Sequence, residues 1–270
     1  MKYFLYLFYG DDLIPNLINN IQMQIVQISD LHVGSQFLQE KFDILVDEVN
    51  ELNPDVIVIT GDLTNEGLMS EYKKCKSLLT KFNTKKIITI SGNHDYRNTG
   101  YLLFKKFFPF ETVNELSDDV VLVTVGTARP DRNNGEVGYR QNLWLERTMK
   151  KYKDKVKIVA MHHHLISIPD TGSDQLTVVD AGDVLRAVLD SKVDVVLCGH
   201  KHRPWAWNFG SLTVVNAGTA TSERVRGLFE NTYNILTISD KNVKVDLKIV
   251  GGKRLPIEEI MNNYSQFGDE

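Results

Sequence analysis

The sequence predicts an α/β fold with one main domain, residues 23–250. Short runs rich in β-branched residues alternate with helical patterns as far as Cys198, which is typical of parallel strands joined by crossover helices. The run Val56–Ile59 has no polar residue, as expected of a strand that is covered on both faces. With 42% hydrophobic and 24% charged residues among 270, the chain has enough apolar material for a sizeable core.

The predicted strands of this region are short apolar runs, namely Ile25–Ile28, Val56–Ile59, Lys86–Ile90, Val120–Val125, Val156–Met161 and Val193–Cys198. The predicted helices between them have apolar residues at helical spacing and cover Gln39–Leu52, Glu66–Phe82, Tyr139–Lys151 and Val179–Leu189. Pro54 ends the first helix.

The C-terminal third of the domain has a different character, because no helices separate its strands. Hairpin-like turns join the runs Trp205–Phe209, Leu212–Val215, Tyr233–Ser239 and Val243–Val250. We therefore expect this part either to build a second sheet or to complete the first one, in antiparallel fashion.

Both ends of the chain lie outside the predicted domain. The apolar run Tyr3–Tyr9 is too short to span a bilayer, and no small-residue cleavage site follows it. We interpret residues 1–22 as a non-core extension, for which a misassigned start site is one explanation. An extra helix or strand packed on the domain is the alternative. Residues 251–270 are predicted to be a polar tail with a short helix.

Charge and cysteine content restrict the classes of function. A net charge of −4 provides no general attraction to nucleic acid or to an anionic membrane, so phosphate binding requires a local site. The two cysteines, Cys75 and Cys198, lie in a predicted helix and a predicted strand. They are expected to be reduced thiols, which favours a cytoplasmic protein.

All seven histidines fall in windows that directly follow predicted strands. The windows are Asp30-Leu31-His32, Gly92-Asn93-His94-Asp95, His162-His163-His164 and Gly199-His200-Lys201-His202, and a fifth strand leads to Gly61-Asp62. Because the carboxyl ends of parallel strands share one edge of a sheet, we expect the windows to converge. Imidazole, carboxylate and amide groups together form a ligand set that suits Mn, Fe, Zn or Co.

The order of these windows resembles that of the calcineurin-like metallophosphoesterases, most closely the cyclic-nucleotide and glycerophosphodiester phosphodiesterase group. The resemblance covers residues 23–250 and implies a sandwich of two mixed β-sheets flanked by helices. It also implies two divalent metal ions. One would be held by Asp30, His32, Asp62 and His202, and the other by Asp62, Asn93, His162 and His200. Among the three consecutive histidines, His164 is the alternative ligand, since it shares a strand face with His162.

The resemblance further implies hydrolysis of a phosphodiester, or of a phosphomonoester, in a small substrate such as a cyclic nucleotide. A hydroxide bridging the two ions would attack phosphorus. His94 would donate a proton to the leaving group and Asp95 would orient it. Arg97, Arg203, Arg224 and His164 are candidate substrate contacts.

Other features bear on the substrate and on the alternatives. The polar loop Gly126–Gly138 is expected to border the site, and Trp205 and Trp207 either stack on a base or pack in the fold.

A metal-dependent nuclease of the same superfamily is the second hypothesis for the function. The acidic net charge and the absence of a basic stripe disfavour it. A non-catalytic scaffold is the least expected, because every motif ligand is present. A homo-oligomer is compatible with the sequence.

Overall fold

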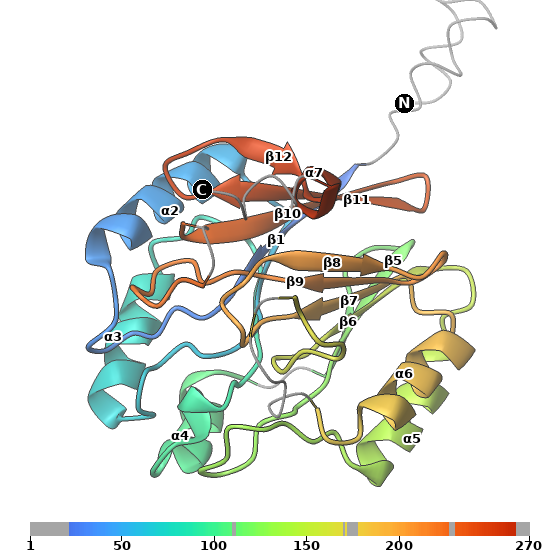
Figure 1. Cartoon of the computed structure of the whole chain (residues 1–270), viewed down its shortest axis with the longest axis horizontal. Helices are drawn as coiled ribbons and strands as arrows, with labels where there is room; N and C mark the ends of the chain where they lie inside the picture. The colour runs from blue at the N-terminus through green and yellow to red at the C-terminus, as the bar shows by residue number, and fades with distance from the viewer. Residues whose placement is uncertain (1–21, 110–111, 170, 172–177, 227–229, 263–270) are drawn as a thin grey trace, which may run out of the picture.

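Two six-stranded β-sheets face each other in the computed structural model, and helices cover the outer face of each sheet (Figure 1). The structure describes residues 22–109, 112–169, 171, 178–226 and 230–262. Residues 1–21 of the predicted extension lie outside this part of the chain. The predicted sandwich of two mixed sheets flanked by helices is therefore confirmed.

The first sheet contains, in spatial order, β12 (Arg254–Pro256), β11 (Asn242–Ile249), β10 (Thr232–Ser239), β1 (Met23–Ile28), β2 (Val56–Ile59) and β3 (Ile87–Thr89). The second contains β4 (Val113–Glu115), β5 (Val120–Thr124), β6 (Val156–Ala160), β7 (Val195–Cys198), β9 (Thr213–Asn216) and β8 (Trp205–Asn208). Helices α2 (Gln39–Leu52), α3 (Met69–Leu79) and α4 (Gly100–Phe107) pack on the first sheet, and α5 (Tyr139–Met149) and α6 (Ala181–Asp190) pack on the second.

The strands are apolar along their whole length because their side chains alternate between two hydrophobic cores, one on each face of the sheet. In β2, Val56 and Val58 point between the sheets, whereas Ile57 and Ile59 point toward α2 and α3. This alternation follows from the two-residue repeat of a strand. The sandwich thus has three apolar layers, which fix both sheets relative to the helices outside them.

The C-terminal third divides between the two sheets. Strands β10, β11 and β12 are antiparallel and extend the first sheet from β1. Strand β8 is antiparallel to β9, but β9 lies parallel to β7. The expectation of a purely antiparallel third was therefore wrong at β9, because the β8–β9 hairpin inserts its second strand beside β7. Strand β12 and α7 (Ile257–Asn262) lie in the segment 251–270, where Ile257 and Ile260 are buried.

Several element boundaries differ from the predicted ones. The helix predicted over Glu66–Phe82 is shorter, since Gly67 has a left-handed backbone (φ 66°) and Glu71 accepts hydrogen bonds from the backbone of Glu66 and Leu68. Helix α4, strand β4 and a 3₁₀ turn over His94–Tyr96 were not predicted. Within the described residues, no helix is both long and apolar enough to cross a membrane.

Candidate metal centre

The five windows meet at the carboxyl ends of strands from both sheets, not at one sheet edge as the sequence had suggested. Backbone hydrogen bonds join them in pairs: Asp30 N–H donates to Gly61 O (3.1 Å), and His32 N–H donates to Asp62 O (2.9 Å). In the second sheet, Gly199 N–H donates to His162 O (2.8 Å). The loops that carry the predicted ligands therefore hold one another in place.

Five of the seven predicted ligands have left-handed backbone conformations. They are Asp30, His32, Asp62, His200 and His202, with φ between 50° and 76°. A residue with a side chain pays roughly 1–2 kcal/mol for this conformation. Such outliers gather at functional sites, where the surrounding structure enforces them. The same five side chains are thereby turned into one small volume.

Two glycines allow the windows to approach this closely. A Cβ atom on Gly92 would lie 2.1 Å from the Asp62 Oδ1 atom, and one on Gly199 would lie 2.1 Å from Ser29 Oγ and 2.8 Å from Asp30 Oδ2. Any side chain at these positions would displace a predicted ligand. The glycines of the two motifs are thus required by contact, and not by a positive φ.

The first group of donor atoms comes from Asp30, His32, Asp62 and His202. The Nε2 atoms of His32 and His202 are 2.9 Å apart. His202 Nε2 lies 3.3 Å from Asp30 Oδ1, and His32 Nε2 lies 3.7 Å from Asp62 Oδ2. Ligands of one ion with bonds of about 2.0–2.2 Å are separated by roughly 3–3.6 Å, so these donors are spaced as the ligands of one ion would be.

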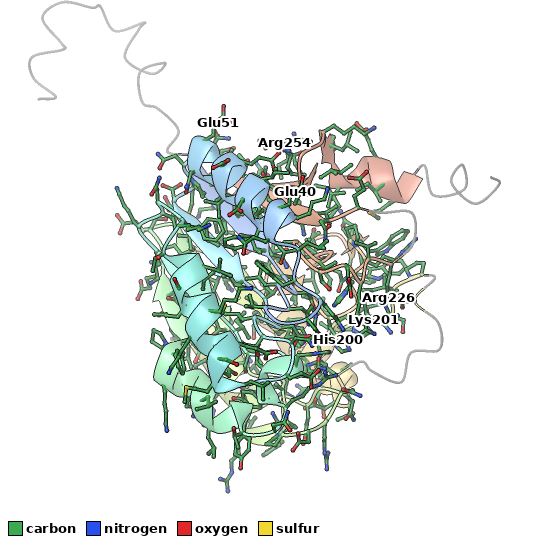
Figure 2. The ribbon with its side chains drawn as sticks, turned by 90° about the vertical axis from the view of Figure 1, so that its left-hand side faces the viewer. Glu40, Glu51, His200, Lys201, Arg226 and Arg254 are labelled. Carbon is green, nitrogen blue, oxygen red and sulfur yellow. The ribbon has the colours of Figure 1, made fainter. Side chains whose placement is uncertain are left out.

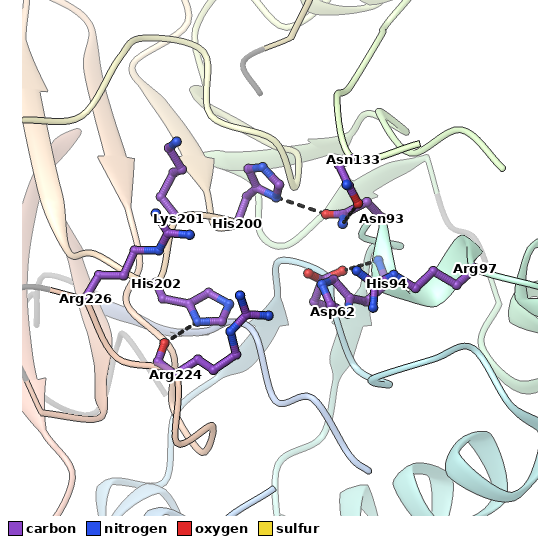
Figure 3. A pocket seen from close by; sticks show the side chains of 10 residues that line it. All are labelled: Asp62, Asn93, His94, Arg97, Asn133, His200, Lys201, His202, Arg224 and Arg226. Carbon is purple, nitrogen blue, oxygen red and sulfur yellow. Dashed lines mark hydrogen bonds between the residues drawn. The ribbon is translucent and has the colours of Figure 1, made fainter. Parts of the chain in front are cut away.

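The second group comes from Asp62, Asn93, His162 and His200. The Asn93 Oδ1 atom lies 3.1 Å from His162 Nε2 and 2.9 Å from His200 Nδ1. His162 Nε2 is also 3.4 Å from Asp62 Oδ2. Because Asp62 Oδ2 is close to donors of both groups, its carboxylate lies between them (Figure 3).

The fit of these residues to metal ions rests on a buried carboxylate oxygen that has no hydrogen-bond partner. Among the described residues, this atom is Asp30 Oδ1, and the Nε2 atoms of His202 and His32 lie 3.3 and 3.8 Å from it. A buried polar group without a partner costs free energy. A cation beside Asp30 Oδ1, facing the His32 and His202 nitrogens, would compensate this carboxylate, so the donor set fits divalent ions.

Backbone carbonyls fix which ring nitrogen of several histidines points inward. His202 Nδ1 donates to Arg224 O (2.5 Å), and His162 Nδ1 donates to Thr60 O (2.8 Å). Each bond leaves the Nε2 lone pair facing the donor group. Carbonyls that hold the outer nitrogen are the usual second layer of a histidine metal site.

His94 is held in the same way, but not by the predicted residue. Its Nδ1 atom donates to Asn65 O (2.7 Å), and its backbone N–H donates to Asp62 Oδ1 (2.8 Å). We had expected Asp95 to orient the His94 ring. Instead, Asp95 accepts hydrogen bonds from Leu63 N, Thr64 N and Oγ1, and Gly92 N. Asp95 therefore joins the loops after β2 and β3.

The electrostatics of the site favour the deprotonated forms that bind metals. Burial raises the pKa of Asp30, but His202 and His32 outweigh this and hold it well below its usual value. Burial likewise opposes ionisation of Asp62, whose pKa is nevertheless kept low by His162 and His94. Burial lowers the pKa of His32 to about 4. At neutral pH both carboxylates are thus anionic and the His32 ring is neutral.

The pKa values of His162 and Asp95 are raised, in contrast to those of Asp30, Asp62 and His32. Burial lowers the pKa of His162, but the Asp62 carboxylate beside Nε2 raises it to about 9. A metal ion would therefore compete with a proton for this nitrogen. Burial, followed by repulsion from Asp62, raises the pKa of Asp95 to about 7.

The two other histidines of the triple run are buried beside the centre. His163 uses both ring nitrogens, with Nδ1 2.8 Å from Thr127 Oγ1 and Nε2 3.2 Å from Asn133 O. His164 stacks on the His200 ring at a centroid distance of 5.6 Å. His163 forms a possible ligand group with His162 and His200 on distance alone, but its hydrogen bonds occupy the atoms that such a group would need.

An open pocket of about 560 Å³ lies over the donor atoms. It is lined by Asp62, Asn93, His94, Arg97, Asn133, His200, Lys201, His202, Arg224 and Arg226 (Figure 3). His200, Lys201 and Arg226 lie together on one side of the molecule, away from Glu40 and Glu51 on α2 (Figure 2).

The pocket includes only some of the candidate substrate contacts. Arg97 and Arg224 line it, whereas Arg203 and His164 are buried outside its lining. Asn133 confirms that the loop Gly126–Gly138 borders the site. Arg226 was missed because no motif surrounds it in the sequence.

The two tryptophans do not line the pocket. Trp205 is buried, and the Trp207 indole N–H donates to Ser167 O (3.1 Å). Their rings contact each other at a centroid distance of 5.8 Å. The positions of the two tryptophans therefore support a role in packing of the fold and not in stacking on a base.

Comparison with known proteins places these features in a wider context. A family model for calcineurin-like phosphoesterases matches residues 23–204. A probable glycerophosphodiester phosphodiesterase, GpdQ, of Arcobacter nitrofigilis is 28% identical over 221 residues, which cover 74% of this chain and 80% of that protein. A 3′,5′-cyclic-nucleotide phosphodiesterase of Nostoc is 26% identical over 204 residues, with 68% and 73% covered. A dimetal phosphatase from Danio rerio shares the fold, with a TM-score of 0.67 at 10% identity over 87% of this chain and 98% of that one.

Proposed function

The chain belongs to the calcineurin-like phosphoesterase family, and on this premise we propose that it is a dinuclear-metal-dependent phosphodiesterase of small phosphate esters. The observation that carries the proposal is the Asp62 carboxylate, which lies within 3.7 Å of His32 Nε2 and 3.4 Å of His162 Nε2. One carboxylate between two groups of imidazoles is the arrangement that a pair of bridged ions requires. Relatives named as cyclic-nucleotide and glycerophosphodiester phosphodiesterases support the substrate class.

In this proposal, Asp30, His32, Asp62 and His202 hold one ion, and Asp62, Asn93, His162 and His200 hold the other. The mixed nitrogen and oxygen set favours Mn, Fe, Zn or Co over Ca or Mg. Such a pair supplies charge neutralisation of the phosphoryl oxygens and a water of lowered pKa. All other steps fall to side chains of the chain itself.

His94 is the proposed proton donor to the leaving oxygen. Its Nδ1–H stays on the Asn65 carbonyl, so the proton would come from Nε2 of a protonated ring. Arg97 lines the same side of the pocket and donates to Glu66 Oε1 at 2.8 Å. That ion pair leaves Arg97 in a defined position from which it contacts the scissile phosphate.

Two buried cysteines support a cytoplasmic location. Cys75 and Cys198 are free thiols in separate cores, as is usual in a reducing compartment. Burial raises the pKa of both thiols, that of Cys198 to about 12. They are therefore unreactive, and they take no part in the proposed chemistry.

The proposal is tested with purified protein, the chromogenic diester bis(p-nitrophenyl) phosphate, and Mn²⁺, Zn²⁺ or Ca²⁺ added after chelation. We expect activity to return with Mn²⁺ or Zn²⁺ and not with Ca²⁺. The variant Asn93→Ala should lose this activity, whereas Asn242→Ala, on an exposed residue of β11, should keep it. Protein that stays inactive with every metal would overturn the proposal.

A panel of 3′,5′- and 2′,3′-cyclic nucleotides, glycerophosphodiesters, single-stranded DNA and phosphomonoesters then separates the substrate classes. We expect a small diester to have the highest kcat/KM. Preference for a phosphomonoester over every diester would contradict the diesterase assignment, and preference for single-stranded DNA would favour the nuclease.

A further inference from the structure

One end of the pocket carries two arginine side chains that the proposed chemistry does not use. Arg224 and Arg226 line it on the side of His200 and His202, whereas Arg97 and His94 lie on the opposite side (Figure 3). We propose that Arg224 and Arg226 bind a second phosphate group of the substrate, separate from the phosphate that is hydrolysed. This inference rests on the phosphodiesterase function proposed above and names its substrate class.

The position of Arg224 is set by its backbone. Its carbonyl accepts the His202 Nδ1 hydrogen bond (2.5 Å), and its N–H donates to Ser222 Oγ (3.2 Å). Ser222 N–H in turn donates to Thr219 Oγ1, which donates to the carbonyl of Asp30 (2.6 Å). Although the Arg224 side chain is exposed, it therefore starts from a backbone that is tied to two predicted metal ligands.

Arg224 and Arg226 differ from Arg97 in their ion pairs among the described residues. Arg97 has an ion pair with Glu66 at 2.8 Å. In the part of the chain that the structure describes, neither Arg224 nor Arg226 has a carboxylate within ion-pair distance, although the exposed Glu223 precedes Arg224 in the sequence. The hydrogen bond recorded for the Arg226 guanidinium goes to the Thr171 carbonyl at 3.5 Å.

The distribution of charge in the pocket points to an anion at this end. The metal ions would already neutralise the phosphate that is hydrolysed, and Arg97, which is paired with Glu66, lies on the His94 side. Two additional guanidinium groups are therefore more positive charge than a single phosphodiester anion needs. Guanidinium forks match the oxygen atoms of a phosphate group.

The pocket is open, and its space of about 560 Å³ includes the mouth. A ligand that is longer than a single phosphate ester can therefore extend from the metal centre toward the arginine end (Figure 3). Substrates that fit this description are nucleotides or sugar esters that carry a terminal phosphate as well as the diester. A diester with an uncharged or cationic second arm would leave the arginine end unused.

The test compares two chromogenic esters that differ only in the second phosphate: thymidine 5′-(p-nitrophenyl phosphate) and its 3′-phosphorylated form. Both release p-nitrophenolate, so the ratio of their kcat/KM values reports the contribution of the extra phosphate. We expect the ratio to exceed one in the Mn²⁺-loaded wild type and to fall about tenfold in R224Q/R226Q, the effect of losing a charge-assisted hydrogen bond. Raising the ionic strength should lower the wild-type ratio as well.

The control is R147Q, which removes an exposed arginine on α5 outside the pocket and should leave the ratio unchanged. If the double variant loses activity on both esters equally, the arginines serve the hydrolysed phosphate and the inference is overturned. A wild-type ratio of one or below also overturns it, while the phosphodiesterase function stands. Inactivity of the wild type on both esters would instead count against the proposed function.

Discussion

The ring of His202 and the backbone carbonyl of Arg224 are joined by a hydrogen bond of 2.5 Å. This bond presents His202 Nε2 to the donor group of Asp30 and His32, and it also fixes the segment from which the Arg224 side chain enters the pocket. The metal site and the proposed phosphate subsite therefore share one structural element.

His94 should matter most for substrates with poor leaving groups. We expect His94→Ala to lower kcat about 10²- to 10⁴-fold for 3′,5′-cyclic AMP or a glycerophosphodiester, whose alkoxide leaving groups need a proton. Loss on bis(p-nitrophenyl) phosphate should be much smaller, because p-nitrophenolate leaves without protonation. Steady-state rates on both substrates check this, and an equal loss on both would show that His94 acts in another way.

Asp95 should act on the position of loops and not on proton transfer. Its carboxylate accepts four hydrogen bonds from Leu63, Thr64 and Gly92, and an amide in Asp95→Asn would place donors against donors. We expect a loss of roughly 3 kcal/mol in the free energy of unfolding and weaker metal binding. The ratio of rates on alkyl and nitrophenyl esters should not change.

Chemical denaturation and metal titration measure these effects of Asp95→Asn. Asp240→Asn is a matched control, since Asp240 lies in an exposed turn with φ 49°, a conformation that asparagine tolerates. An Asp95 variant of normal stability and metal affinity that responds to the leaving group as His94→Ala does would contradict the positioning role.

His162 and His163 should differ in metal binding although both are buried. His162→Ala removes the Nε2 atom that faces Asn93 and Asp62, so we expect loss of one metal equivalent. His163→Ala removes hydrogen bonds to Thr127 and Asn133 and should keep both equivalents. Metal content per chain, measured by elemental analysis after dialysis, distinguishes the two, and loss of metal in His163→Ala alone would reverse the assignment.

Gly92→Ala should disrupt the metal site through a single methyl group. The added Cβ would lie 2.1 Å from Asp62 Oδ1 and 2.5 Å from Asp62 N, so Asp62 has to move. We expect severe loss of metal binding and activity, together with a lower melting temperature. Gly182→Ala in α6 is the control: nothing lies within 4 Å of its added Cβ, and it should stabilise the helix by up to about 1 kcal/mol.

Local sequence patterns were sufficient for most of the strands, though not for β4 and β12, and for the placement of the metal windows. A run such as Val56–Ile59 followed by Gly61 and Asp62 specifies a buried strand, a tight turn and a carboxylate within a few residues. The division into two sheets could not be derived from such patterns, because β1 pairs with β10 across most of the chain, and because β9 and not β8 lies beside β7. Here the family resemblance, and not the periodicity, supplied the prediction.

The contacts that orient the site were less predictable than its ligands. Asn65 holds His94, and Arg224 holds His202, through backbone carbonyls, which every residue has and no sequence pattern marks. Asp95 directly follows His94 and was therefore expected to serve it, but the 3₁₀ turn directs its carboxylate to the loop after β2. Arg226 lines the pocket because the chain passes the metal site between β9 and β10, and no local sequence pattern indicates this course of the chain.

The left-handed backbone of five predicted ligands costs the fold free energy while it places their donor atoms for metal binding. These ligands are Asp30, His32, Asp62, His200 and His202. At each of these positions glycine would adopt the observed conformation without a steric penalty, yet it would remove a donor atom. Selection for stability alone would therefore erode this centre one ligand at a time. The presence of a donor side chain at all five positions, where glycine would cost the fold less, is what a requirement for a bound cation explains.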